Sequence, residues 1–168
     1  MDIDVREATA DDVEPVREVA RDSWYAAYGS FIAPDAIDRG LEASYDPELL
    51  AAAVAHEAIA FSVAEVDAEV VGFASAERTW ADEVELHTIY VHPDWWGEGV
   101  GSALLEAAIS FALDEGVDRL VCAVFDDNVV GIGFLEARGF ERGQAGRAII
   151  GGEQLPEHEF ELSLEDRR

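Results

Sequence analysis

The sequence predicts one α/β domain, and three segments carry this prediction. Glu85–Leu105 resembles a strand, a short turn and a glycine-rich helix start that follow one another without a spare residue. Ile59–Val66 and Glu69–Ala76 are apolar runs joined by a tight turn, which is typical of an antiparallel hairpin. Leu120–Phe125 is apolar on both faces, as buried strands are. The length suits a single domain, residues 1–168.

The first part of the chain is predicted to begin with a short strand, Ile3–Glu7, and to continue as helix. Thr9–Asp12 matches a capping box, with Asp in the Glu position. Apolar side chains then recur at helical spacing: Val13, Val16, Val19, Ala20 and Trp24. Four aromatic residues at the end of this helix could be core residues or the wall of a substrate pocket: Trp24, Tyr25, Tyr28 and Phe31.

Two further helices, Pro34–Leu41 and Pro47–His56, are expected before the hairpin. Asp46 followed by Pro47 is a favourable N-cap and first-turn pair for the second of them. After the hairpin, residues 77–82 are expected to be a connection to the central strand.

The central strand, Val84–Val91, changes character along its length. Glu85 and His87 share one face, and strict alternation would place Ile89 and Val91 on the same face. A polar face that becomes apolar midway predicts a β-bulge near Thr88–Tyr90.

A glycine-rich turn follows the central strand. Gly97, Gly99 and Gly101 alternate after His92-Pro93-Asp94, and a helical pattern begins at Ser102. Glycines at a helix start let backbone N–H groups surround an anion, which the helix dipole also favours. The turn is therefore predicted to bind phosphate, although a loop that merely needs positive φ is the simpler alternative. A Walker loop is excluded because the chain has no lysine, and a Rossmann fingerprint fits poorly because position 102 is serine.

The last third of the chain is expected to be strand, helix and two closing strands. The helix is predicted to begin at Asn128 and to end at Gly139, which is a plausible C′ residue. Ala145–Ile150 and His158–Leu164 are the closing strands, and the second alternates as a strand with one wet face does.

The charge is extreme, with eleven arginines, no lysine and 37 carboxylates giving a formal net charge of −26. Such self-repulsion opposes compaction at ordinary ionic strength and is screened at molar salt. We interpret the composition as adaptation to a saline cytoplasm, such as that of a halophilic archaeon. Nucleic acid and anionic membranes are unfavourable partners for this surface. The single Cys122 excludes an internal disulfide, which suits a cytoplasmic protein.

Two segments resemble the conserved motifs of the GNAT superfamily of N-acetyltransferases. Val91-His92-Pro93 followed by residues 96–101, WGEGVG, is similar to the motif Q/R-x-x-G-x-G/A after its strand end. Residues 128–140, NVVGIGFLEARGF, are similar to N-x-x-A-x-x-F-Y-E-x-x-G-F. Two departures stand out: Trp96 replaces the usual Gln or Arg, and Leu135 replaces the usual Tyr.

The resemblance implies a mixed, mostly antiparallel, splayed sheet of six to seven strands with helices on both faces. It also implies transfer of an acetyl group from acetyl-CoA to a primary amine, with no metal. The bulge would separate two strands so that the pantetheine arm pairs with free backbone groups, and Asn128 would bond that arm or act as an N-cap. The residues expected at the cofactor are Ile89, Tyr90, Val91, Trp96, Gly97, Glu98, Gly99, Val100, Gly101, Ser102, Asn128 and Phe134.

Glu85 is the expected general base, because burial in an apolar strand would raise its pKa toward neutrality. His87 is the competing base. A backbone N–H near Tyr90 or Val91 would stabilise the oxyanion. Leu135 cannot donate a proton, so Tyr90, a water molecule or unaided thiolate departure would serve in its place.

The acceptor is open at this point, and small polyamines, amino acids, antibiotics and protein N-termini are all compatible with the sequence. A cationic acceptor would suit the acidic surface, and the oligomeric state is open, a homodimer included. The rival interpretation is a non-catalytic module that binds or senses acyl-CoA. Trp96 and Leu135 favour that rival, and Glu85 opposes it.

Overall fold

The computed structural model describes residues 2–167 and contains one seven-stranded sheet in the order β1-β2-β3-β4-β5-β7-β6. Every neighbouring pair is antiparallel except β4 and β5, which are parallel. The predicted mixed, mostly antiparallel sheet is therefore confirmed. The strands are β1 (Asp4–Glu7), β2 (Ile59–Val66), β3 (Glu69–Trp80), β4 (Glu83–Val91), β5 (Arg119–Phe125), β6 (Glu141–Ile150) and β7 (Glu153–Ser163).

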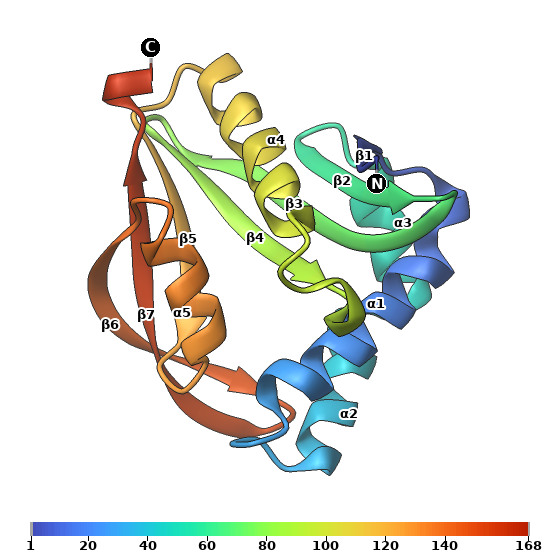
Figure 1. Ribbon diagram of the computed structural model, residues 1–168. Coiled ribbons are helices and arrows are strands. Elements are labelled where there is room, and N and C mark those ends of the chain that lie inside the picture. Colours follow the sequence, from blue (N-terminus) through green and yellow to red (C-terminus); the bar gives the residue numbers. More distant parts are fainter. Residues whose placement is uncertain (1, 168) are drawn as a thin grey trace.

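Helices cover both faces of the sheet, as predicted (Figure 1). The helices are α1 (Val13–Tyr28), α2 (Pro34–Ser44), α3 (Pro47–Ala55), α4 (Val100–Asp114) and α5 (Val129–Glu136), with short 3-10 turns η1 (Ala10–Asp12), η2 (Pro93–Trp95) and η3 (Glu165–Arg167). One core packs α4 and α5 on the sheet around Leu104, Leu135 and Phe160. The other packs the helices α1 to α3 on the opposite face around Ile37 and Phe73. Among the described residues, none of the helices combines the length and the apolar character that crossing a bilayer requires.

The predicted helix-capping interactions before α1 and α3 are present. Asp12 accepts a hydrogen bond from the Thr9 N–H at 2.8 Å, as a capping box requires, and it also pairs with Arg6 at 2.8 Å. Asp46 accepts from the N–H groups of Glu48 and Leu49 at 3.1 and 3.2 Å, which confirms it as an N-cap.

Strand ends differ from the expectation in two places. Residues 77–80, expected in a connection, extend β3 because Glu77 pairs with Glu85 and Arg78 with Val84. The closing strands begin earlier than predicted and form one long hairpin around Gly151 and Gly152, both at positive φ. Residues 141–147 are all exposed on the edge strand β6, so no apolar alternation marks them as strand.

A bulge in β4 reverses which face its side chains occupy. Thr88 lies opposite Ser75 and Leu86 opposite Ala76, so His87 is the extra residue on β4. The predicted bulge is confirmed, but it lies one residue before the expected Thr88–Tyr90. The shift moves Ile89 and Val91 onto the α4 face, where they pack against the same core as Leu86.

β4 and β5 pair over only three residues, from Glu83 opposite Arg119 to Glu85 opposite Val121. Beyond Glu85 the two strands diverge, as the ribbon shows, while β5 continues to pair with β7 as far as Phe125 (Figure 1). The divergence leaves one backbone edge of β4 without a strand partner, which places the predicted splay after Glu85.

Candidate active site

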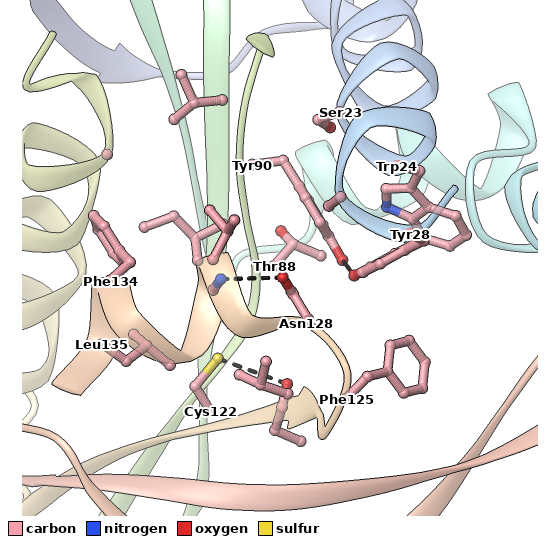
Figure 2. A pocket seen from close by; sticks show the side chains of 18 of the residues that line it. Ser23, Trp24, Tyr28, Thr88, Tyr90, Cys122, Phe125, Asn128, Phe134 and Leu135 are labelled. Carbon is pink, nitrogen blue, oxygen red and sulfur yellow. Dashed lines mark hydrogen bonds between the residues drawn. The ribbon is translucent and has the colours of Figure 1, made fainter. Parts of the chain in front are cut away.

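A cavity of about 1140 Å³ lies where β4 and β5 diverge. Its wall includes residues from both sides of the sheet. Phe134 and Leu135 of α5 lie on one side in the close-up, and Trp24 and Tyr28 of α1 on the other (Figure 2). The volume is slightly above the usual range of about 300–1,000 Å³ for small-molecule sites. A passage through the sheet can bring two substrates together from opposite faces.

The glycine turn at the α4 side has the geometry of an anion site. Gly97 and Gly99 adopt φ values of 78° and 90°, which other residues rarely adopt. The first backbone bond of α4 runs from the Ala103 N–H to the Gly99 carbonyl at 3.1 Å. The N–H groups of residues 99–102 therefore have no acceptor within the helix and are available to a phosphate.

Gly101 lacks a side chain for a separate reason. A Cβ at this position would lie 2.8 Å from the ring of Phe134. The missing side chain thus brings α4 and α5 close together beside the anion turn. The structure starts α4 at Val100, two residues before the predicted Ser102.

Trp96 differs from the usual Gln or Arg in what its side chain does. Its indole Nε1 donates to the Val91 carbonyl at 2.8 Å across the η2 turn. The ring lines the cavity but carries no charge for a phosphate. The bond also occupies the Val91 carbonyl, which is then less available to a ligand.

The structure brings most of the expected cofactor residues to this cavity. Two do not line it: Val100, the first residue of α4, is fully buried against the sheet, and Glu98 is exposed. Asn128 lines the cavity and is at the same time the N-cap of α5, accepting from the Gly131 N–H at 3.0 Å. The residues that do line it are Ile89, Tyr90, Val91, Trp96, Gly97, Gly99, Gly101, Ser102, Asn128 and Phe134.

Glu85 and His87 form one hydrogen-bonded group with Glu77. His87 Nδ1 lies 2.9 Å from Glu85 and Nε2 lies 3.0 Å from Glu77. His87 lines the cavity, whereas Glu85 does not. The bond to His87 lowers the pKa of Glu85, so the expected rise in that pKa was wrong. The same bond to Glu85 raises the pKa of His87.

Tyr90 points to the α1 side of the sheet, away from the place that the usual family tyrosine would occupy. Its hydroxyl lies 2.8 Å from that of Tyr28, and Leu135 is buried in the core of the opposite face (Figure 2). Burial raises the pKa of Tyr90 to about 12. Tyr90 therefore keeps its hydroxyl proton across the physiological range, and either hydroxyl can donate in the bond to Tyr28.

The aromatic residues at the end of α1 were expected to be either core residues or pocket wall, and they differ in which they are. Trp24 and Tyr28 are both buried core residues and cavity wall. Tyr25 is exposed and bonds Asp38, while Phe31 packs against Tyr28 and Phe125.

Residues that the sequence did not single out also line the cavity. Glu157 of β7 does so, and its pKa is raised by burial and by the charges of Glu85 and Asp126. Among the described residues, none donates a hydrogen bond to its carboxylate. Arg39 of α2 donates from Nε to the Gly151 carbonyl at 2.9 Å, and both residues line the cavity. Arg138, after α5, lies beside the anion turn.

Comparison with known proteins shows which family this chain resembles. The family model for the acetyltransferase (GNAT) family matches residues 14–140. A spermidine N(1)-acetyltransferase from Thermoplasma acidophilum is 27% identical over 84% of this chain and 89% of its own length. An uncharacterized N-acetyltransferase from Methanocaldococcus jannaschii is 34% identical over 48% of this chain and 38% of its own.

Solved structures share the fold. PaiA N-acetyltransferase from Thermoplasma acidophilum, in complex with coenzyme A, superposes with a TM-score of 0.86 at 24% identity, covering 97% of this chain and 99% of that one. YncA from Salmonella typhimurium, with its cofactor acetyl-CoA, gives a TM-score of 0.73 at 23% identity, covering 98% and 95%. The match to the family model covers most of the chain, and the cavity has the anion turn and open strand edge that a coenzyme A ester needs. This chain belongs to the GNAT family of N-acetyltransferases, whose co-substrate is acetyl-CoA.

Proposed function

We propose that this enzyme acetylates a primary amine of a small linear polycation of the polyamine class. The spermidine N(1)-acetyltransferase that is similar over most of both chains supports this acceptor class. The observation that carries the proposal is a row of carboxylates on the sheet face beside the cavity. We call Glu85, Glu157, Glu159 and Glu161 the acidic face.

The acidic face follows from strand register. Glu157, Glu159 and Glu161 alternate along β7 and so share one face. They lie opposite Phe125, Ala123 and Val121 of β5, and Val121 also pairs with Glu85 of β4. Neither α4 nor α5 covers this face, because those helices pack on Leu120, Cys122 and Phe160 of the other one.

Negative charge on this face is incompletely balanced. Arg119 pairs with Glu161 at 3.1 Å and with Glu83 at 3.0 Å. Glu159 has a raised pKa because of its partial burial and the neighbouring charges of Glu83 and Glu161. Glu157, which lines the cavity, has a raised pKa for similar reasons. Ammonium groups of a polycation would relieve this repulsion.

Glu157 is the proton acceptor in our proposal. A base must reach the amine, and Glu157 lines the cavity whereas Glu85 does not. Its raised pKa brings it nearer the operating pH, as general-base catalysis favours. His87 bonds carboxylates through both ring nitrogens, which requires the protonated ring, and an imidazolium cannot accept a proton. Glu85, the base predicted from sequence, would then act through His87.

In this proposal, acetyl-CoA and the amine occupy opposite faces of the sheet. Acetyl-CoA supplies the acetyl group as a thioester, and the turn at Gly97–Ser102 would hold its diphosphate. The terminal nitrogen, as the neutral amine, attacks the thioester carbon and gives one proton to Glu157, so that a C–N bond forms and the C–S bond breaks. The sulfur leaves as a thiolate, which needs no side-chain acid because thiols have a pKa near 8.5.

A panel of amines tests the proposal. The protein is mixed with acetyl-CoA in molar potassium chloride, thiol release is followed, and each product is identified by mass spectrometry. We expect turnover with spermidine and shorter diamines, and one acetyl group on a terminal nitrogen. Turnover confined to peptide N-termini or amino acids would overturn the polyamine assignment. The absence of turnover with any amine, despite acetyl-CoA binding, would instead favour a non-catalytic acyl-CoA-binding module.

A further inference from the structure

Arg138 is fixed beside the anion turn by contacts from three directions. Its Nε and Nη2 donate to the Ser102 hydroxyl at 3.1 and 2.5 Å, and Nη1 donates to the Phe134 carbonyl at 2.9 Å. The guanidinium carbon lies 3.8 Å from the centre of the Phe134 ring. A side chain held in this way loses little further rotamer entropy when it binds a ligand.

The charge of Arg138 has no carboxylate partner, a property that it shares with Arg39, Arg78, Arg142 and Arg147 among the described residues. Among the described residues, no carboxylate lies within ion-pair distance of it, although the chain has 37 carboxylates. Arg6 and Arg119, by contrast, each pair with two or more carboxylates. The partners of Arg138 are a hydroxyl, a carbonyl and a ring, so its positive charge is not neutralised.

That charge faces the place where an anion is expected. Arg138 lines the cavity together with Gly99, Gly101 and Ser102 of the anion turn. The Ser102 hydroxyl accepts from Arg138, which leaves the hydroxyl proton free to point elsewhere. The N–H groups at the start of α4 and the guanidinium thus converge on one region without an anionic side chain between them.

We propose that Arg138 binds a phosphate of coenzyme A and supplies the cation that Trp96 does not. The sequence motif usually carries Gln or Arg at position 96, and here that side chain is an indole bonded to the Val91 carbonyl. Arg138, two residues after the end of α5, reaches the same turn through its bonds to Ser102. The shared chemistry is a phosphate oxygen, from either the diphosphate or the 3′-phosphate. This inference depends on the acetyl-CoA co-substrate and not on the choice of acceptor.

Calorimetry with coenzyme A tests the inference without any turnover. Arg138→Gln is compared with the parent protein and with Arg142→Gln, a matched control whose guanidinium lies over the Phe160 ring away from the cavity. We expect Arg138→Gln to weaken coenzyme A binding about 10- to 100-fold, the usual range for a charge-assisted hydrogen bond. Arg142→Gln should bind as the parent does. The affinity of Arg138→Lys for coenzyme A should lie between those of the parent and Arg138→Gln, because lysine keeps the charge and loses the paired N–H donors of the guanidinium.

Two further ligands, one without the 3′-phosphate and one without any phosphate, show which phosphate Arg138 binds and whether it only has a structural role. If the loss in Arg138→Gln disappears with 3′-dephospho-coenzyme A, the 3′-phosphate is the partner. If the loss persists there but disappears with pantetheine, the diphosphate is the partner. An equal loss with pantetheine would overturn the inference, because Arg138 would then only hold α5 in place. Binding of coenzyme A within twofold of the parent would also overturn it.

Discussion

His87 Nδ1 lies 2.9 Å from the carboxylate of Glu85, so the predicted base and its competitor form one hydrogen-bonded pair. Glu77 completes the group on the other ring nitrogen at 3.0 Å. Both bonds favour the protonated imidazole, which is why the pKa of His87 is raised. The pair is strongest when the imidazole is protonated, so its contribution to stability depends on pH.

The first prediction concerns that contribution. A group with a raised pKa in the folded state stabilises fully below its unfolded value, 6.5 for His87, and loses this effect as pH rises through the folded value. His87→Gln should therefore lower the free energy of unfolding near pH 6 and change it little near pH 9. The difference should be about 1 kcal/mol or less, because the group is half exposed. Urea unfolding at both pH values measures it.

His56→Gln is the matched control for this measurement. His56 is exposed at the end of α3, and among the described residues it has no carboxylate partner. It should show no such pH dependence. A His87→Gln protein that loses the same stability at both pH values would show that packing, not charge, is what His87 contributes.

The second prediction separates the two candidate bases. Glu157→Gln should lower kcat by about 10²- to 10⁴-fold, and Glu85→Gln by about tenfold or less. Glu157→Gln should also raise the melting temperature, because it removes a carboxylate whose pKa is raised by burial and by the charges of Glu85 and Asp126. Glu57→Gln, in an exposed turn, should change neither quantity. If Glu85→Gln shows the larger loss of kcat, Glu85 is the base after all.

The third prediction concerns the anion turn. Gly99→Val should abolish measurable acetyl-CoA binding, because a side chain at φ 90° distorts the turn and obstructs the diphosphate. Gly116→Val is a matched control, since Gly116 also has positive φ (74°) but lies in the turn after α4, outside the cavity. Both variants should lose comparable stability, and only Gly99→Val should lose binding by calorimetry. Tight binding by folded Gly99→Val would place the cofactor elsewhere.

The elements that follow sequence periodicity were predictable, and so was the bulge. The polar Glu85 and His87 followed by apolar Ile89 and Val91 could be reconciled with a sheet only if β4 contained an extra residue. The geometry of the glycine turn was predictable for a similar reason, because alternating glycines before a helical pattern indicate positive φ at a helix start.

The positions of Glu157, Arg138 and Trp96 in the cavity could not be predicted from sequence. Glu157 alternates with apolar residues like any residue on a wet strand face, and only the register with Phe125 shows that it reaches the cavity. Arg138 sits where basic side chains commonly close a helix, so its contact with Ser102, 36 residues away, needs the packing of α5 on α4. The bond from Trp96 to the Val91 carbonyl needs the η2 turn.

The fourth prediction concerns salt. The net charge of −26 destabilises the compact state through self-repulsion, which salt screens. The melting temperature should rise as potassium chloride increases from about 0.1 M to about 2 M. Differential scanning fluorimetry with a salt-insensitive dye measures this. A melting temperature that is flat or falls over that range would contradict adaptation to a saline cytoplasm.

The acceptor assignment is tested most directly by the ratio of kcat/KM for spermidine to kcat/KM for a monoamine of similar length. We expect the parent protein to favour spermidine by about tenfold or more, because in our proposal the second and third ammonium groups would lie along the acidic face. Glu159→Gln, which removes a carboxylate outside the cavity, should lower that ratio by about two- to fivefold and leave the monoamine unaffected. A parent ratio near one, or a ratio that Glu159→Gln leaves unchanged, would contradict the account.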